Sequence, residues 1–245
     1  MAKTTIARYI PLLILPLQIL NLAQAAVFGA AIAGNNDGYV IGLIQRIACC
    51  HAAYAVFIAV NSVVVFLVLI THIYFWINIT RYYDYYGYDF ARGHGTVFKI
   101  LLFIAEVLIP ILFYPWLILA SIWDGVNYRT TNSTFAIIFT AGTLLHLWLT
   151  TALLSYIYKN RREAEVDDDQ SVKMKWILTI LYTLFVLAYA ILQWIWTIIP
   201  PGENTTQHVI VAAMQWLAWI FLWAWHATFY YELGFLDIEK ERRTV

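Results

Sequence analysis

Charged side chains are scarce in this sequence of 245 residues: they account for 12% of it, whereas apolar residues make up 62%. A water-soluble domain carries about twice that share of charge. The two cysteines, Cys49 and Cys50, are adjacent within an apolar run and indicate no disulfide framework. The net charge is zero, which gives no indication of a nucleic-acid partner. These features exclude an ordinary soluble domain and a disulfide-stabilised module.

The sequence also lacks the alternating ten-residue strands that are typical of a membrane barrel. It contains instead six long apolar stretches, each close to the roughly 20 residues that a helix needs to cross the hydrocarbon core. They are Tyr9–Ala33, Ile47–Ile77, Ile100–Trp123, Phe135–Tyr158, Trp176–Ile199 and Val209–Tyr231. We therefore predict an all-α polytopic membrane bundle of six transmembrane helices with short loops, which forms a single domain over residues 1–245.

Basic residues are distributed unevenly over the predicted loops. Thirteen of the 15 lysines and arginines fall on one side of the membrane, and Arg46 and Arg129 fall on the other. The thirteen are Lys3, Arg8, Arg81, Arg92, Lys99, Lys159, Arg161, Arg162, Lys173, Lys175, Lys240, Arg242 and Arg243. Because short cytosolic loops are enriched in basic residues, this pattern predicts that both termini are cytosolic.

Two sequence signals bear on processing. Ala23-Gln24-Ala25 has the form of a signal-peptidase site, but the apolar run continues through Ala33, which favours a retained span over a cleaved signal. The sequons that begin at Asn132 and Asn204 fall in predicted lumenal loops, so we expect a glycoprotein, whereas Asn78 falls at a cytosolic end.

Polar residues inside the predicted spans are informative, because hydrocarbon cannot satisfy them. Gln18, Asn21 and Gln24 recur every three residues in the first span and are expected to face other helices. Glu106 is the only acidic residue within any predicted span, and Pro110 follows it by four residues. Proline cannot donate to the carbonyl of residue 106, which predicts a local irregularity in that helix.

Depth within the membrane groups some of these residues. Counted from the predicted span ends, Glu106 lies about 9 Å and His226 about 8 Å from the cytosolic face, and His72 lies at a similar depth. His146 is expected nearer the midplane. We predict that Glu106, His146 and His226 line one polar cavity that serves general acid/base catalysis. The alternative is three separate helix-packing contacts. No cofactor or metal site is predicted.

The last span resembles a known signature. Met214–Glu232 reads MQWLAWIFLWAWHATFYYE and resembles the final helix of the FRAG/DRAM/SFK family: an amide, an aromatic residue, an apolar run, His-x-Thr, two aromatic residues and an acid. The segment around His146 resembles the fourth helix of that family, and Glu106 falls where its third helix has a glutamate. Lys173–Trp176 resembles the entry to its fifth helix. The resemblance covers Lys99 to Asp237.

The form His226-Ala227-Thr228 is most similar to the Golgi branch of that family. The resemblance implies lipid remodelling of GPI anchors in the Golgi or ER membrane, by reacylation of lyso-GPI, as the acyltransferase or its essential subunit. The implied partners are the GPI anchor lipid, the bilayer and another membrane protein. A non-enzymatic scaffold of the DRAM/SFK type, which regulates lipid-kinase recruitment or autophagy, is the alternative. A transporter ranks lowest because no internal repeat is visible.

Overall fold

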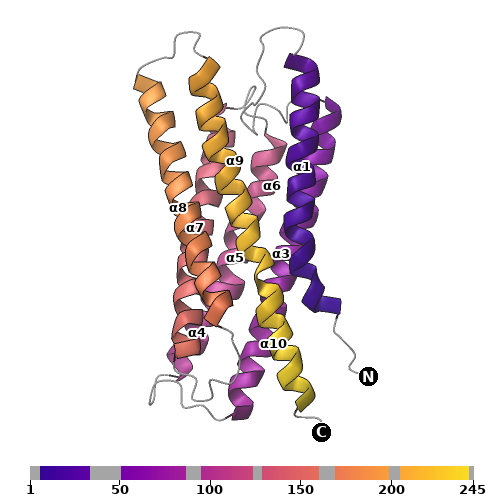
Figure 1. Cartoon of the computed structure of the whole chain (residues 1–245), viewed down its shortest axis with the longest axis vertical. Helices are drawn as coiled ribbons and strands as arrows, with labels where there is room; N and C mark the ends of the chain where they lie inside the picture. Colours follow the sequence, from indigo (N-terminus) through magenta and orange to yellow (C-terminus); the bar gives the residue numbers. More distant parts are fainter. Residues whose placement is uncertain are drawn as a thin grey trace.

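The computed structural model describes residues 6–33, 51–86, 95–123, 129–159, 169–198 and 205–242, and over these residues every regular element is helical (Figure 1). The helices run lengthwise beside one another as a bundle. In chain order the elements are η1 (Ile6–Tyr9, a 3₁₀ turn), α1 (Ile10–Ala33), α3 (His51–Tyr86), α4 (Gly95–Phe103), η2 (Ile104–Leu108, a π-helix), α5 (Ile109–Phe113), α6 (Pro115–Ile122), α7 (Arg129–Lys159), α8 (Asp169–Ile198), α9 (Thr205–Ala227) and α10 (Phe229–Arg242).

Several helices extend beyond the apolar runs that predicted them. Helix α3 continues to Tyr86 instead of Ile77, α7 begins at Arg129 instead of Phe135, and α8 begins at Asp169 instead of Trp176. An apolar run marks the part of a helix that lies in hydrocarbon, whereas the hydrogen-bonded helix continues into polar sequence. The 36 residues of α3 span about 54 Å, which exceeds the roughly 30 Å thickness of the hydrocarbon core.

Five helices of the described chain are long and apolar enough to cross a membrane, over Ala55–Arg81, Gly95–Ile122, Thr130–Ile157, Gln170–Ile195 and Ile210–Gly234. The 24-residue α1 packs against α3 and α9, and its assignment as a sixth span stays a prediction. The start of α1 and the end of α10 lie at the same end of the bundle (Figure 1). Which end faces the cytosol also stays a prediction. Gly34–Cys50 and Asn204 lie outside the described residues.

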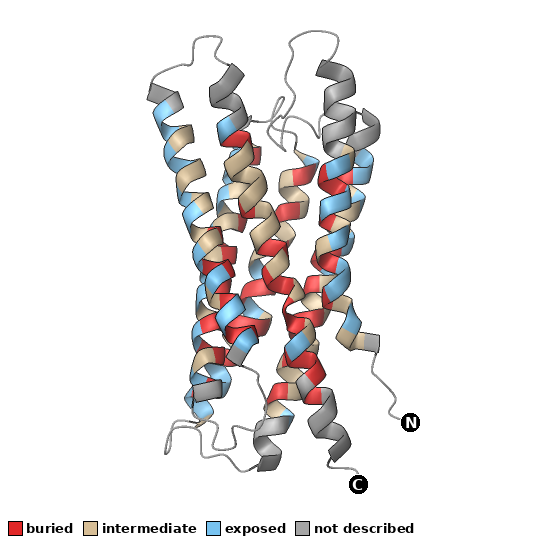
Figure 2. Ribbon diagram, viewed as in Figure 1, coloured by how far each residue is buried: buried red, intermediate tan, exposed pale blue. Residues whose placement is uncertain are grey.

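The surface of the bundle is largely apolar, whereas the buried positions, red in Figure 2, include both apolar and polar side chains. Large apolar side chains point outward: Phe66 is 63% exposed and Ile137 is 68% exposed. The interior contains fully buried polar side chains such as Asn61 and Lys175 beside apolar ones such as Trp223. This distribution suits a lipid environment, in which polar groups must find partners inside the protein.

Asn61 of α3 is the centre of a polar network between helices. Its side-chain oxygen accepts from Gln18 Nε2 at 3.0 Å and from Asn21 Nδ2 at 3.1 Å, and its Nδ2 donates to Ser121 Oγ at 2.9 Å. Gln24 donates to Asn21. The prediction that the amide stripe of the first helix faces other helices is confirmed for Gln18 and Asn21, and the network joins α1 to α3 and α6.

The third span is divided into four short segments that suit its prolines. The backbone N–H of Ile109 donates to the carbonyl of Ile104, which is the i→i−5 bond of a π turn, and Pro110 follows directly. This confirms the predicted irregularity near Glu106. A second break falls at Tyr114, because Pro115 has no N–H to continue the helix. Gly142 of α7 allows close approach to this span, since a Cβ there would overlap the Phe113 ring.

The first sequon differs from its predicted place. Asn132 lies within the first turn of α7 instead of in a loop, and it is 2% exposed. Its Nδ2 donates to the carbonyls of Ala120 and Trp123, both at 2.6 Å. The side chain therefore closes the end of α6 against α7, because the last carbonyls of a helix have no partner within it.

Candidate functional site

Three imidazoles from three different helices meet in the interior of the bundle. His72 comes from α3, His146 from α7 and His226 from α9, and all three are completely buried. The ring centroid of His72 lies 4.5 Å from that of His146 and 5.1 Å from that of His226, and the third separation is 5.9 Å. His72 Nε2 and His226 Nδ1 are 3.0 Å apart. We call these residues the histidine triad.

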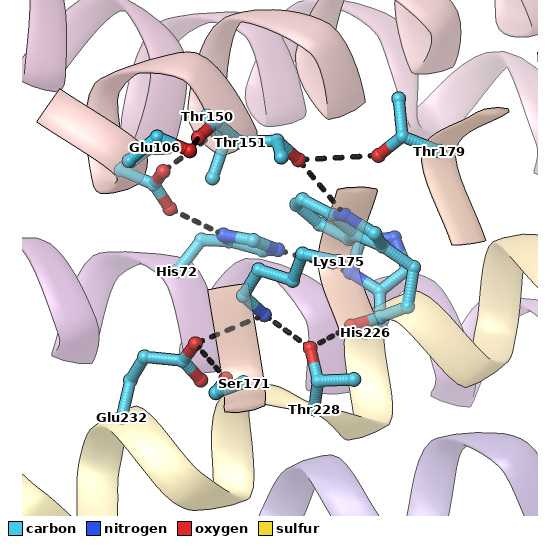
Figure 3. Close-up of polar contacts among 12 residues, drawn as sticks. His72, Glu106, Thr150, Thr151, Ser171, Lys175, Thr179, His226, Thr228 and Glu232 are labelled. Atoms are coloured by element: carbon cyan, nitrogen blue, oxygen red, sulfur yellow. Dashed lines mark hydrogen bonds and ion pairs between the residues drawn. The ribbon is translucent and has the colours of Figure 1, made fainter. Parts of the chain in front are cut away.

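Glu106 binds the outer side of this triad (Figure 3). Its Oε2 lies 2.7 Å from His72 Nδ1, and its Oε1 accepts a hydrogen bond from Thr150 Oγ1 at 2.7 Å. Each carboxylate oxygen thus has one partner, and the side chain is fully buried. The π-helical segment η2 supplies this residue from the third span. A π turn within an α-helix is often found at a functional site.

Tyr114 connects the other two imidazoles. Its hydroxyl lies 2.9 Å from His146 Nδ1 and 2.7 Å from His226 Nε2. The residue occupies the break between α5 and α6, immediately before Pro115, and is fully buried. Glu106 and Tyr114 therefore contact the triad from the two sides of α5, in the middle of the third span.

Aromatic side chains enclose the triad. Trp225 stacks on the His72 ring at 6.1 Å with an interplanar angle of 18°, and Phe229 packs edge-on against the same ring at 4.6 Å. The indole nitrogen of Trp225 donates to Thr151 Oγ1, which in turn is hydrogen-bonded to Thr179 of α8 (Figure 3). The threonines fix the indole, because a buried Trp N–H requires a partner.

A second buried group, around Lys175, contacts the same two aromatic rings, Trp225 and Phe229. The ammonium of Lys175 is 3.4 Å from Glu232 Oε1, donates to Thr228 Oγ1, and lies 3.7 Å from the centroid of the Phe229 ring. Ser171 donates to the same carboxylate oxygen at 2.5 Å (Figure 3). Thr228 occupies the one-residue turn between α9 and α10. We call Lys175, Glu232, Ser171 and Thr228 the lysine cluster.

Two buried polar atoms of these groups have no hydrogen-bond partner among the described residues. They are His146 Nε2 in the histidine triad and Glu232 Oε2 in the lysine cluster. A buried polar atom without a partner costs about 1–3 kcal/mol. Such atoms are candidates for direct contact with a ligand.

The structure brings Glu106, His146 and His226 together, as the sequence predicted, but it connects them through other residues. His72 bridges Glu106 to His226, and Tyr114 bridges His226 to His146. The predicted cavity and the catalytic role of these residues stay predictions. His146 is not deeper than the others, because its ring is in contact distance of the His72 ring.

Counting from the real helix ends explains this correction. Glu106 lies 11 residues beyond the start of α4, which is about 16 Å along the helix, whereas the predicted depth of about 9 Å was counted from Ile100. His226 is followed by a further 16 residues to the end of α10. Both residues are therefore further from the end of the bundle than the apolar runs implied.

The sequence analysis placed two residues of the site elsewhere, Lys175 and Glu232, and did not identify a third, Tyr114. Lys175 was counted among the cytosolic basic residues, but it lies inside α8 and is fully buried. Tyr114 resembles the many interfacial tyrosines of the sequence, and only its place before Pro115 within a span distinguishes it. Glu232 was placed just past the last span, yet it is 1% exposed.

Comparison with known families gives one match. The model of the Frag1/DRAM/Sfk1/Cwh43P N-terminal domain matches residues 50–235, which is more than half of the chain. The matched range includes the histidine triad, Glu106, Tyr114 and the lysine cluster. No curated protein and no solved structure matches the chain.

Proposed function

Because this multi-pass membrane protein belongs to the Frag1/DRAM/Sfk1/Cwh43P N-terminal domain family, we propose that it remodels the lipid of GPI anchors by reacylating lyso-GPI. One observation carries the proposal: the three imidazoles of the triad, Glu106 and Tyr114 converge inside a bundle whose outer surface is apolar. The His226-Ala227-Thr228 motif, which resembles the Golgi branch of the family, supplies the substrate class and the Golgi or ER location.

The proposed reaction transfers an acyl chain from a thioester or ester donor to the free hydroxyl of the lysolipid. The hydroxyl oxygen forms a new ester bond with the acyl carbon, and the bond between that carbon and its thiol or alcohol leaving group breaks. The hydroxyl proton leaves the acceptor and ends on the departing group, so no oxidant or reductant is needed. The site must therefore accept a proton and stabilise negative charge on the carbonyl oxygen.

The chemical groups of the site suit these tasks. Imidazoles exchange protons readily near neutral pH, and a carboxylate on the outer nitrogen of His72 orients that ring. The Tyr114 hydroxyl and the imidazole N–H groups are donors that can face a developing oxyanion. Burial between apolar helices excludes water, which disfavours hydrolysis of the donor relative to transfer to a lipid.

The test is lipid analysis of GPI-anchored proteins in cells that lack this chain. We expect anchors without the second, remodelled acyl chain, and restoration by the wild-type sequence. His226→Ala and Glu106→Gln should reach normal abundance and location yet fail to restore the anchor. His208→Ala and Glu241→Gln are matched controls, because they make the same changes on α9 and α10 outside the site.

Unchanged anchor lipids in cells that lack the chain would refute the proposal and favour the scaffold. Restoration of the anchor by the His226 and Glu106 variants at wild-type level would refute the role of the site. If a variant is poorly expressed, remodelling is compared per molecule of protein, since loss in proportion to abundance indicates helix packing alone.

A further inference from the structure

The arrangement of the histidine triad has a second chemical meaning. Five of its six ring nitrogens have a hydrogen-bond partner, and His146 Nε2 has none among the described residues. One nitrogen of each ring lies within 4.8 Å of the chosen nitrogens of the other two. Three imidazoles that converge in a buried interior form a typical set of metal ligands.

The spacing of the rings fits one shared ion. With a metal–nitrogen bond of about 2.0–2.1 Å, tetrahedral ligand nitrogens stand about 3.3 Å apart and the ring centroids about 5 Å apart. His72 Nε2 and His226 Nδ1 are 3.0 Å apart. The centroid separations of 4.5, 5.1 and 5.9 Å lie on both sides of the expected value. Small rotations of the imidazoles therefore suffice to complete the coordination.

The ring nitrogens that contact Glu106 or Tyr114 have the kind of partner that the non-coordinating nitrogen of a metal-binding histidine usually has. A metal-binding histidine donates its other N–H to a carboxylate, a carbonyl or water, which fixes the ring and raises its basicity. His72 directs Nδ1 to Glu106 at 2.7 Å. His146 and His226 each direct one nitrogen to the hydroxyl of Tyr114. Each ring thus has one nitrogen with a partner outside the triad, and a second nitrogen that has no partner outside the triad.

From this geometry we propose that the histidine triad binds a single zinc ion, with Glu106 and Tyr114 as positioning residues. Zinc is the choice because imidazole suits it, because no thiolate lies in the triad, and because three histidines with an open fourth position are typical of catalytic zinc. The carboxylate of Glu106 offsets part of the charge of the ion, which an apolar interior requires.

Zinc binding itself does not depend on the lipid substrate, whereas its use in acyl transfer rests on the proposed function. The acyl carbonyl would occupy the open fourth position of the zinc ion, which would polarise that carbonyl and stabilise the oxyanion. With zinc bound, the three histidines act as ligands and no longer as the proton acceptors and oxyanion donors described under the proposed function; the proton of the acceptor hydroxyl still ends on the departing thiol or alcohol. This assigns the triad, Glu106 and Tyr114 to one centre.

The first test measures metal in the purified full chain. The protein is expressed with added zinc, purified in detergent, dialysed against a metal-free buffer and measured by plasma mass spectrometry. We expect roughly one zinc ion per chain. His72→Ala, His146→Ala and His226→Ala should each lose most of it, and His208→Ala should retain it. Glu106→Gln should lower zinc affinity by about 10- to 100-fold while the three ligands stay in place.

A second measurement does not depend on whether a variant folds. Wild-type protein loaded with Co²⁺ should show the intense visible absorption of tetrahedral cobalt, and added zinc should remove it. A wild-type protein without stoichiometric metal and without this spectrum overturns the proposal, as does zinc retained in all three histidine variants. Zinc binding with unchanged anchor lipids would refute the proposed function alone. Metal-free protein that still remodels anchors would refute the use of zinc in acyl transfer, and absence of bound metal and of the cobalt spectrum would refute the zinc site itself.

Discussion

Replacement of Lys175 by methionine tests whether the lysine cluster stabilises the end of the bundle near the triad. The ammonium is fully buried, 3.4 Å from Glu232 Oε1 and over the ring of Phe229. Methionine has a similar unbranched shape but no charge, so Lys175→Met leaves the carboxylate buried beside Ser171 alone. Glu232→Gln makes the reverse change and leaves the ammonium without its counter-ion.

The expected size follows from the burial of both partners, which are 0% and 1% exposed. Removal of one partner of a buried ion pair costs about 3–5 kcal/mol, because the remaining charge stays in a medium of low polarity. For a chain of this length that corresponds to a fall in melting temperature of about 6–20 °C. The double variant Lys175→Met with Glu232→Gln has no unpaired charge and should be less destabilised than the sum of the two single variants.

The measurement is the melting temperature of each variant purified in the same detergent, followed by tryptophan fluorescence. Lys173→Met is the control, because it removes a lysine from the same helix two residues away. The reasoning is refuted if the two single effects add without coupling in the double variant. It is also refuted if Lys175→Met melts within about 1 °C of the wild type.

Three further changes test other parts of the structure. Tyr114→Phe removes the hydroxyl shared by His146 and His226. We expect anchor remodelling per molecule, measured by lipid analysis, to fall about 10- to 100-fold, and unchanged remodelling would contradict the role of Tyr114. Asn61→Leu removes three hydrogen bonds to other helices, and we expect a loss of roughly 2–5 kcal/mol of stability, seen as a lower melting temperature. The control Ser62→Ala removes a hydroxyl that bonds to its own helix and should change the melting temperature little. Asn132 should carry no glycan, because its Nδ2 is buried and donates to two carbonyls; a glycosidase-sensitive shift that Asn132→Gln abolishes would show the opposite.

The helical class and the inward direction of the polar residues could be predicted from the sequence, because hydrocarbon imposes both. An apolar run without charges specifies a helix, and an amide within that run specifies a helix–helix contact. Helix ends could not be predicted in this way. Lys175 shows the reason: a lysine at the edge of an apolar run looks cytosolic, whereas the helix begins at Asp169 and carries it inward to Glu232.

The site was predicted in part for a similar reason. Glu106, His146 and His226 were identifiable because ionisable residues are costly in hydrocarbon. The contacts between them depend on how five helical segments rotate about their axes, and no local pattern in the sequence determines that rotation. Tyr114 shows the limit, since tyrosine is common at membrane interfaces and only the packed structure places its hydroxyl between two imidazoles.

The π turn at Glu106 determines the direction, around the helix axis, in which the later side chains of the third span point. Positions 106 and 114 are eight residues apart, and in an uninterrupted α-helix their side chains would diverge by about 80° around the axis. The wider turn of η2 and the break before Pro115 change that angle, and Glu106 contacts His72 while Tyr114 contacts His146 and His226. A π turn takes in one residue more than an α-helical turn, so deletion of one residue from the segment 104–108 would restore a regular helix. The extra residue therefore changes the angle between the two side chains around the helix axis. One helix can then direct both an acid and a phenol to a single centre, whereas an ideal helix would direct only one of them.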